Sequence, residues 1–201
     1  MKIFRKSLVA IAVSLLATIA HASVYVGDTT QTGIRTGGVS TGQMVCTYFT
    51  AGASGTPTVG DVYFGNAGIE AYLVAYAFVS TTGGTLIEQS NLISSTTVGW
   101  NSFTFASSVT ITSGSQYYLC VFTTVTTAEV GYGKTSVGSG NGMVYMNTAW
   151  PTAPTTFTKG GLLVGNNVSA YLGAVPPATY PVLSNGHALL SNSKPLVGSN
   201  F

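Results

Sequence analysis

Charged residues make up only 6% of this 201-residue chain, whereas hydrophobic residues make up 45% and aromatic residues 11%, and the formal net charge is +2. A protein surface that binds nucleic acid needs clustered basic side chains to neutralise phosphates. Beyond residue 22 the chain has four Lys and Arg residues, and they are scattered. The composition therefore excludes a nucleic-acid partner.

Residues 1–22 have the three parts of a secretory signal peptide. Three basic residues lie within the first six, the apolar run Leu8–Ala20 follows, and Ala20-His21-Ala22 provides the small residues that a signal peptidase recognises. The run of 13 residues is shorter than the about 20 that a membrane-spanning helix needs. We predict a secreted protein, extracellular or at the cell surface, that begins at Ser23 and has no membrane span. An uncleaved membrane anchor is the alternative.

Cleavage after residue 22 of 201 would leave 179 residues, enough for one domain with a sizeable core. Three of the seven basic residues would be removed, so that four basic residues remain against five acidic ones. The composition divides the remaining chain into a Gly/Thr-rich N-terminal arm at residues 23–42, a β-rich body at 43–174 and a Pro/Ser/Asn-rich tail at 175–201.

The body alternates between short runs rich in Thr, Val, Ile, Tyr and Phe and turns rich in Gly, Ser, Asn and Pro, which is typical of an all-β protein. Many short strands with regular turns favour a sandwich or a barrel over a parallel α/β sheet. The predicted strands are Gln43–Thr50, Val59–Phe64, Ile69–Ser80, Thr85–Gln89, Trp100–Phe105, Val109–Thr112, Gln116–Thr124 and Gly142–Tyr145.

The segment from Ile69 to Ser80 also carries apolar residues at helical spacing. Its alternation and the Gly83-Gly84 turn signal that follows favour a strand. Tyr72 and Tyr76 would then share one sheet face, either as core residues or as a binding platform.

The uncharged stretch TTVGWNSFTFASSVTITSGSQYYLCVF holds a recognisable order of features. These are Gly99-Trp100-Asn101, the aromatic pair Phe103 and Phe105, the apolar pair Val109 and Ile111, the turn Ser113-Gly114-Ser115, and then Tyr117, Tyr118 and Leu119. This order resembles a jelly-roll module of secreted bacterial proteins and phage tail-associated proteins, which is mostly of unassigned function and occurs beside carbohydrate-acting or surface-attached domains. The resemblance covers about residues 43–174. It implies a jelly-roll-like antiparallel β-sandwich with extended N- and C-terminal segments.

Alternation within this stretch assigns its side chains to two faces. Phe103 and Phe105 would share the core face, and Trp100, Ser102 and Thr104 would share the other. The resemblance implies that Trp100 is a structural residue of the module.

The chain has two cysteines, Cys46 and Cys120, both in strand-like runs. In an oxidising compartment an even number of cysteines favours a disulfide. The bridge would close a loop of about 75 residues and contribute about 4 kcal/mol to stability in the chain-entropy model. Two buried free thiols are the alternative. No histidine or further cysteine lies nearby in the sequence, so we predict no metal site.

Catalytic chemistry has little support in the sequence. His187 is the one histidine beyond residue 22, and no Ser-His-Asp or Cys-His set can be assembled around it. The run VGYGKTSVGSGNG lacks the glycine spacing of a phosphate-binding loop, and we predict a flexible loop there. A structural calcium ion is conceivable in such a sandwich, but no Asp-x-Asp-x-Asp run supports one. We therefore predict no catalytic residue, no enzyme activity and no cofactor.

Aromatic side chains give the best indication of a ligand, because the C–H faces of sugar rings stack on Trp and Tyr. Trp150 lies in a Pro-rich loop, and we predict that it binds ligand with Tyr145 and Tyr132. Packing of Trp150 against its own domain is the alternative. The predicted function is a secreted, non-enzymatic surface attachment module for a glycan or cell-surface polymer.

A structural subunit of an extracellular filament, surface layer or virion is the alternative function. Such a subunit would assemble through residues 23–42 and 182–201. The second segment contains apolar residues that suit a partner groove, namely Leu189, Leu190, Leu196, Val197 and Phe201.

Overall fold

The structure is a computed structural model that describes residues 23–31, 33–35, 43–124, 128–135, 142–164 and 166–173. The predicted signal peptide, the predicted C-terminal tail and His187 lie outside these residues. In the described ranges the chain forms strands and no helix, and hence no helix that is long and apolar enough to span a membrane.

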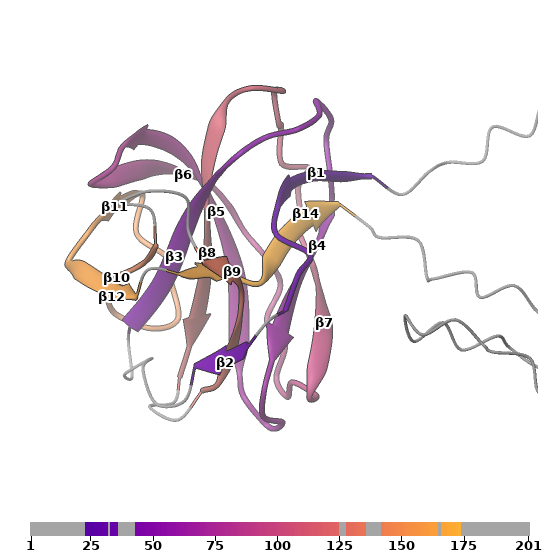
Figure 1. Ribbon diagram of the computed structural model, residues 1–201, viewed down its shortest axis with the longest axis vertical. Helices are drawn as coiled ribbons and strands as arrows, with labels where there is room; N and C mark the ends of the chain where they lie inside the picture. Colours follow the sequence, from indigo (N-terminus) through magenta and orange to yellow (C-terminus); the bar gives the residue numbers. More distant parts are fainter. Residues whose placement is uncertain are drawn as a thin grey trace, which may run out of the picture.

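Two antiparallel seven-stranded sheets make up the fold, which confirms the predicted all-β antiparallel sandwich (Figure 1). Sheet A consists of β1 (Val24–Gly27), β2 (Gly33–Arg35), β4 (Val59–Phe64), β7 (Gly99–Thr104), β9 (Val130–Thr135), β13 (Asn166–Val168) and β14 (Ala170–Gly173). Sheet B consists of β3 (Gln43–Thr50), β5 (Ala71–Ser80), β6 (Gly83–Gln89), β8 (Gln116–Thr123), β10 (Met143–Asn147), β11 (Thr156–Thr158) and β12 (Gly161–Val164).

Most predicted strands exist, and the ambiguous segment from Ile69 to Ser80 contains strand β5. The strand predicted at 109–112 is wrong. Ile111 makes only an isolated bridge to Gly55, and the backbone nitrogen of Val109 donates to the oxygen of Pro57. Both apolar side chains are buried in the core. Their alternation therefore reflects burial on one side of an irregular segment rather than a strand within a sheet.

The N-terminal arm and the glycine-rich loop of the sequence analysis both contribute to sheet A. Strand β1 pairs with β14, and β2 pairs with β9. The prediction of a flexible loop is wrong for residues 130–135, which form β9. Glycine has a packing role there, because a Cβ atom on Gly131 would lie 2.8 Å from the Cδ1 atom of Tyr63.

The sandwich core lies between the two sheets and takes every second residue of their strands. The predicted faces of residues 100–105 are confirmed: Phe103 in β7 and Phe105 just after it are buried, and Trp100, Ser102 and Thr104 point outward. A hydrogen bond of 3.0 Å from the backbone nitrogen of Val168 to the Oγ1 atom of Thr47 links β13 of sheet A to β3 of sheet B.

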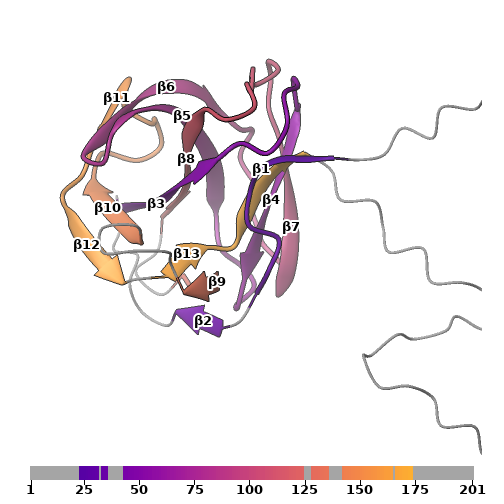
Figure 2. The same cartoon turned by 45° about the horizontal axis from the view of Figure 1, so that its top comes forward.

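Sheet B curls back on itself. Its strand order is β11-β6-β5-β8-β3-β10-β12, yet only residues 159–160 separate β11 from β12 in the chain. The two end strands must therefore lie close together, as Figure 2 shows. The enclosed face of the sheet forms a second hydrophobic cluster, which we call the inner cluster. Its buried residues are Met44, Cys46, Val74, Tyr76, Tyr118, Cys120, Phe122, Val144, Met146, Ala153 and Phe157.

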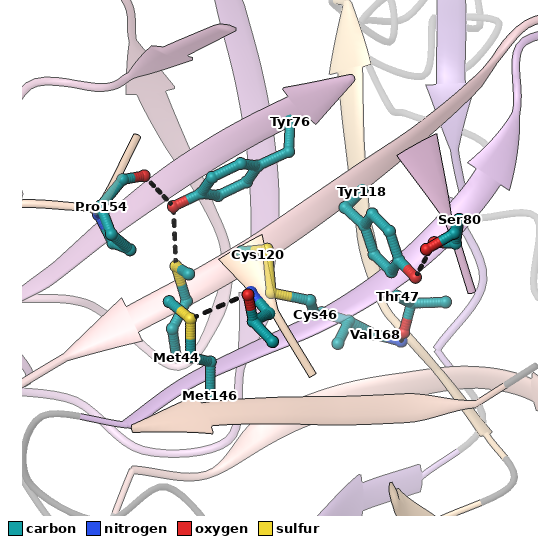
Figure 3. The surroundings of a disulfide bond; sticks show 11 residues. Met44, Cys46, Thr47, Tyr76, Ser80, Tyr118, Cys120, Met146, Pro154 and Val168 are labelled. Atoms are coloured by element: carbon teal, nitrogen blue, oxygen red, sulfur yellow. Dashed lines mark hydrogen bonds between the residues drawn. A yellow bond between two sulfur atoms is a disulfide. The ribbon is translucent and has the colours of Figure 1, made fainter. Parts of the chain in front are cut away.

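The predicted disulfide between Cys46 and Cys120 is confirmed and belongs to the inner cluster (Figure 3). The two residues lie directly opposite each other on β3 and β8, with their Cα atoms 4.0 Å apart. Neither residue is exposed to solvent.

Two tyrosine hydroxyl groups are also buried in this cluster. The hydroxyl of Tyr76 donates to the backbone oxygen of Pro154 at 3.0 Å, and that of Tyr118 donates to the oxygen of Ser80 at 3.0 Å (Figure 3). Burial disfavours the charged phenolate. It raises the pKa of Tyr118 to about 12, with a smaller contribution from Tyr48, and it also raises the pKa of Tyr76.

These shifts predict a loss of stability at alkaline pH. An unfolded tyrosine loses its proton near pH 10, whereas folded Tyr118 keeps it up to a pKa of about 12. The folded state therefore binds more protons in this window, so stability should be complete below about pH 10 and fall as the pH rises towards 12. Tyr118→Phe should reduce this fall, as measured by urea unfolding across the window. Equal pH dependence in the variant and the parent protein would contradict the prediction.

Candidate functional site

The outer face of sheet A brings polar and aromatic side chains together through strand register. Tyr63 on β4 lies opposite Trp100 on β7. Asp61 on β4 lies opposite Ser102 on β7 and also opposite Tyr171 on β14. Directly opposed residues of antiparallel strands share a face. The register therefore places all five side chains on one surface, which we call the aromatic face.

Three rings of the aromatic face contact one another. The ring centroids of Trp100 and Tyr63 lie 5.6 Å apart in a T-shaped arrangement at 89°, and those of Trp100 and Tyr171 lie 5.2 Å apart at 56°. Strands β7 and β14 both pair with Asp61 and thus flank opposite edges of β4. The rings of Trp100 and Tyr171 must therefore meet above β4.

The rings differ in exposure. Trp100 is 36% exposed and Tyr63 is half-buried, whereas Tyr171 is buried. Trp100 thus offers aromatic surface to a ligand while Tyr63 and Tyr171 hold its ring in place. Aromatic pairs at these separations stabilise each other beyond the area that they bury.

Asp61 is only 7% exposed although it carries a carboxylate. The hydroxyl of Ser102 donates a hydrogen bond to its Oδ1 atom. Among the residues that the structure describes, Ser102 is the one side chain that donates to this carboxylate. Lys159, the one basic side chain among those described, lies between β11 and β12 in sheet B.

Glycine permits the close packing beneath two of the rings. Tyr63 lies against Gly131, as described above. Gly27 lies opposite Tyr171 with a φ of 120°, and a Cβ atom there would come 2.4 Å from the Cα atom of Tyr171. Any other residue would be strained at this φ and would displace β14.

The structure gives the predicted ligand residue Trp150 two ring partners in the inner cluster. Its ring centroid lies 5.0 Å from that of Tyr72 and 5.0 Å from that of Phe122. Gln89 holds the loop after Trp150 at two points: its Nε2 atom donates to the oxygen of Pro151 at 2.9 Å, and its Oε1 atom accepts from the nitrogen of Ala153 at 2.7 Å.

Tyr145 lies elsewhere. Its ring packs on the backbone of Gly160 and Gly161, where an added Cβ atom would come within 3.2 Å and 2.7 Å of ring carbons. It alternates along β10 with Val144, which belongs to the inner cluster, so Tyr145 and Trp150 lie on opposite faces of sheet B. The backbone of Tyr132 lies in β9 of sheet A, and its side chain is outside the described part. The structure therefore does not bring Trp150 and Tyr145 together.

The sequence alone does not reveal the aromatic face, because the resemblance to the jelly-roll module marks Trp100 as a structural residue. The outward alternation of Trp100 and Ser102 was visible in the sequence. Their pairing with Tyr63, Asp61 and Tyr171 depends on strand register, and β14 was not predicted at all.

Other candidate chemistry is sparse in the described part of the chain. No group of three or more His, Cys, Asp and Glu residues that could hold a metal ion occurs there. An open hollow of about 520 Å³ at one end of sheet B is lined by Thr50, Phe78, Ser115 and Gln116, among others, and has no charged residue in its wall. The aromatic face is thus the surface that combines exposed aromatic area with a buried charge.

Comparison with protein-family models and with curated proteins found no match to this chain. The function must therefore be argued from the geometry of the aromatic face.

Proposed function

We propose that this protein is a non-enzymatic attachment module that binds a glycan through the aromatic face. The observation that carries the proposal is Trp100, a large aromatic side chain left 36% exposed on a strand and fixed by two tyrosine rings. A secreted location, as the N-terminal sequence predicts, would bring this face to extracellular polymers.

The physical basis is the match between an aromatic ring and the C–H face of a pyranose. A ring already held by its neighbours loses little conformational entropy on binding, so more of the contact energy contributes to affinity. Ser102 and Asp61 lie two residues along their strands from Trp100 and Tyr63. The hydroxyl of Ser102 can donate to and accept from sugar hydroxyl groups, and the carboxylate of Asp61 can accept from them. Stacking and polar contacts together would orient the sugar.

Trp100→Ala should weaken binding to a glycan identified on an array by about 1–2 kcal/mol, which is roughly a 5–30-fold rise in Kd. Isothermal titration calorimetry measures this change. The variant should keep its fold, because the side chain lies on the surface of an edge strand.

Trp150→Phe is the matched control, since it keeps a ring in the inner cluster and should bind as the parent protein does. Retained affinity in Trp100→Ala together with loss in Trp150→Phe would reject the aromatic face and return the site to the residues predicted from the sequence.

A further inference from the structure

We infer that the aromatic face prefers sugars with a free ammonium group, namely 2-amino-2-deoxyhexose units, over their N-acetylated or acidic counterparts. This inference rests on the proposed function and specifies the chemistry of the sugar that the same surface recognises.

The carboxylate of Asp61 can accept more hydrogen bonds than its described side-chain partner supplies. A buried carboxylate is costly unless it is paired or fully hydrogen-bonded. Its two oxygens can accept about four hydrogen bonds. Ser102 supplies one, to Oδ1, and the described residues place no cationic side chain beside it. The carboxylate therefore keeps the capacity to accept hydrogen bonds and a negative charge for a ligand to satisfy.

Three aromatic rings share the surface that carries this carboxylate. The faces of Trp and Tyr rings carry negative electrostatic potential and attract cations. Trp100 and Tyr171 meet above β4, the strand that carries Asp61, and Tyr63 lies two residues further along it. The aromatic rings and the carboxylate thus favour the same sign of charge. An ammonium group donates hydrogen bonds and carries a positive charge, whereas an N-acetyl group is uncharged.

The charges of the described side chains disfavour acidic sugars. The side chains that the structure describes include five carboxylates, on Asp28, Asp61, Glu70, Glu88 and Glu129, against the single ammonium of Lys159. A uronic or sialic acid would bring its own carboxylate towards Asp61 without a described cation to pair with it. Like charges at close range are repelled most strongly where water is partly excluded.

The separation of Trp100 and Asp61 suits one sugar unit. Asp61 is the diagonal neighbour of Trp100 on the paired strand, because it lies opposite Ser102. Such neighbours lie about 7–8 Å apart. Asp61 is 7% exposed, so a pyranose stacked on the exposed part of Trp100 would direct an amino substituent to the edge of the carboxylate that remains open to solvent.

Calorimetric titration of the secreted protein with matched oligomers tests the inference. The probes are β-1,4-linked glucosamine oligomers, the same oligomers N-acetylated, and a uronic acid oligomer of equal length. The glucosamine oligomer should bind about tenfold more tightly than the N-acetylated one, as expected for one charge-assisted contact. Asp61→Asn should bring this ratio close to one.

Salt dependence of the unmodified protein gives a second measurement that does not rely on the variant's folding. Raising the salt concentration should weaken binding of the glucosamine oligomer severalfold and that of the N-acetylated oligomer much less, because screening acts on the charged contact. Equal affinity for the two oligomers, or tighter binding of the uronic oligomer, would overturn the inference and leave glycan binding intact. If the protein bound none of the three oligomers and no glycan on an array, the proposed function itself would be overturned.

Discussion

The double substitution Cys46→Ala/Cys120→Ala is expected to lower the free energy of unfolding by about 4 kcal/mol. The disulfide joins residues 74 positions apart, and in the chain-entropy model a loop of this length restricts the unfolded chain by that amount. The native contacts between β3 and β8 extend over seven residue pairs and should survive the change. The effect should therefore appear as lower stability with an unchanged fold.

Guanidinium unfolding of the oxidised parent protein and the double variant measures this difference, and circular dichroism checks the fold. The reduced parent protein is the control and should match the variant. Because both cysteines are fully buried, alkylation of their thiols in the presence of a reductant should require denaturant. Equal stability of the variant and the oxidised parent protein would contradict the prediction.

Trp150→Ala is expected to destabilise the protein by about 3 kcal/mol. Truncation of a large core aromatic costs about 3–5 kcal/mol, and the half-buried position of Trp150 places it at the lower end of this range. The change removes ring contacts with Tyr72 and Phe122 and opens the inner cluster next to the disulfide.

Two control variants test whether the loss of stability is specific to the ring of Trp150. They are Trp100→Ala and Trp150→Phe. Trp150→Phe retains a ring against Tyr72 and Phe122 and should lose much less stability. Trp100→Ala removes a more exposed ring and should also lose less. Chemical unfolding of the three variants decides the order. A Trp150→Ala variant as stable as the parent protein would show that this side chain is free to serve a ligand, as predicted from the sequence.

Much of the fold could be predicted because it depends on local patterns. The all-β class follows from β-branched and aromatic runs interrupted by Gly, Ser and Pro, since neither composition nor alternation requires knowledge of distant segments. The core position of Phe103 and Phe105 follows from alternation within one strand. The disulfide follows from two cysteines in a chain whose N-terminus predicts secretion.

Strands with weak local signals were missed. The segments that form β1, β2, β9 and β14 are short, rich in glycine or placed near the ends of the described chain. Their backbone hydrogen bonds are made with partners far away in the sequence, as when β1 pairs with β14. Pairing with a distant strand stabilises such segments although their own propensity is low.

Local patterns in the chain establish the all-β class, the inner and outer faces of the clearest strands and the pair of cysteines available for a bridge. The contacts of each aromatic residue depend instead on how the strands pair and how the sheets curl. The curl of sheet B encloses a second cluster, and that closure covers much of Trp150 although its Pro-rich loop suggested exposure. The register of β4 with β7 and β14 brings Trp100, Tyr63, Tyr171 and Asp61 onto one surface. Both outcomes depend on the pairing of segments far apart in the chain. The local sequence determines which face of a strand a side chain lies on, but it does not determine which strands lie beside that strand.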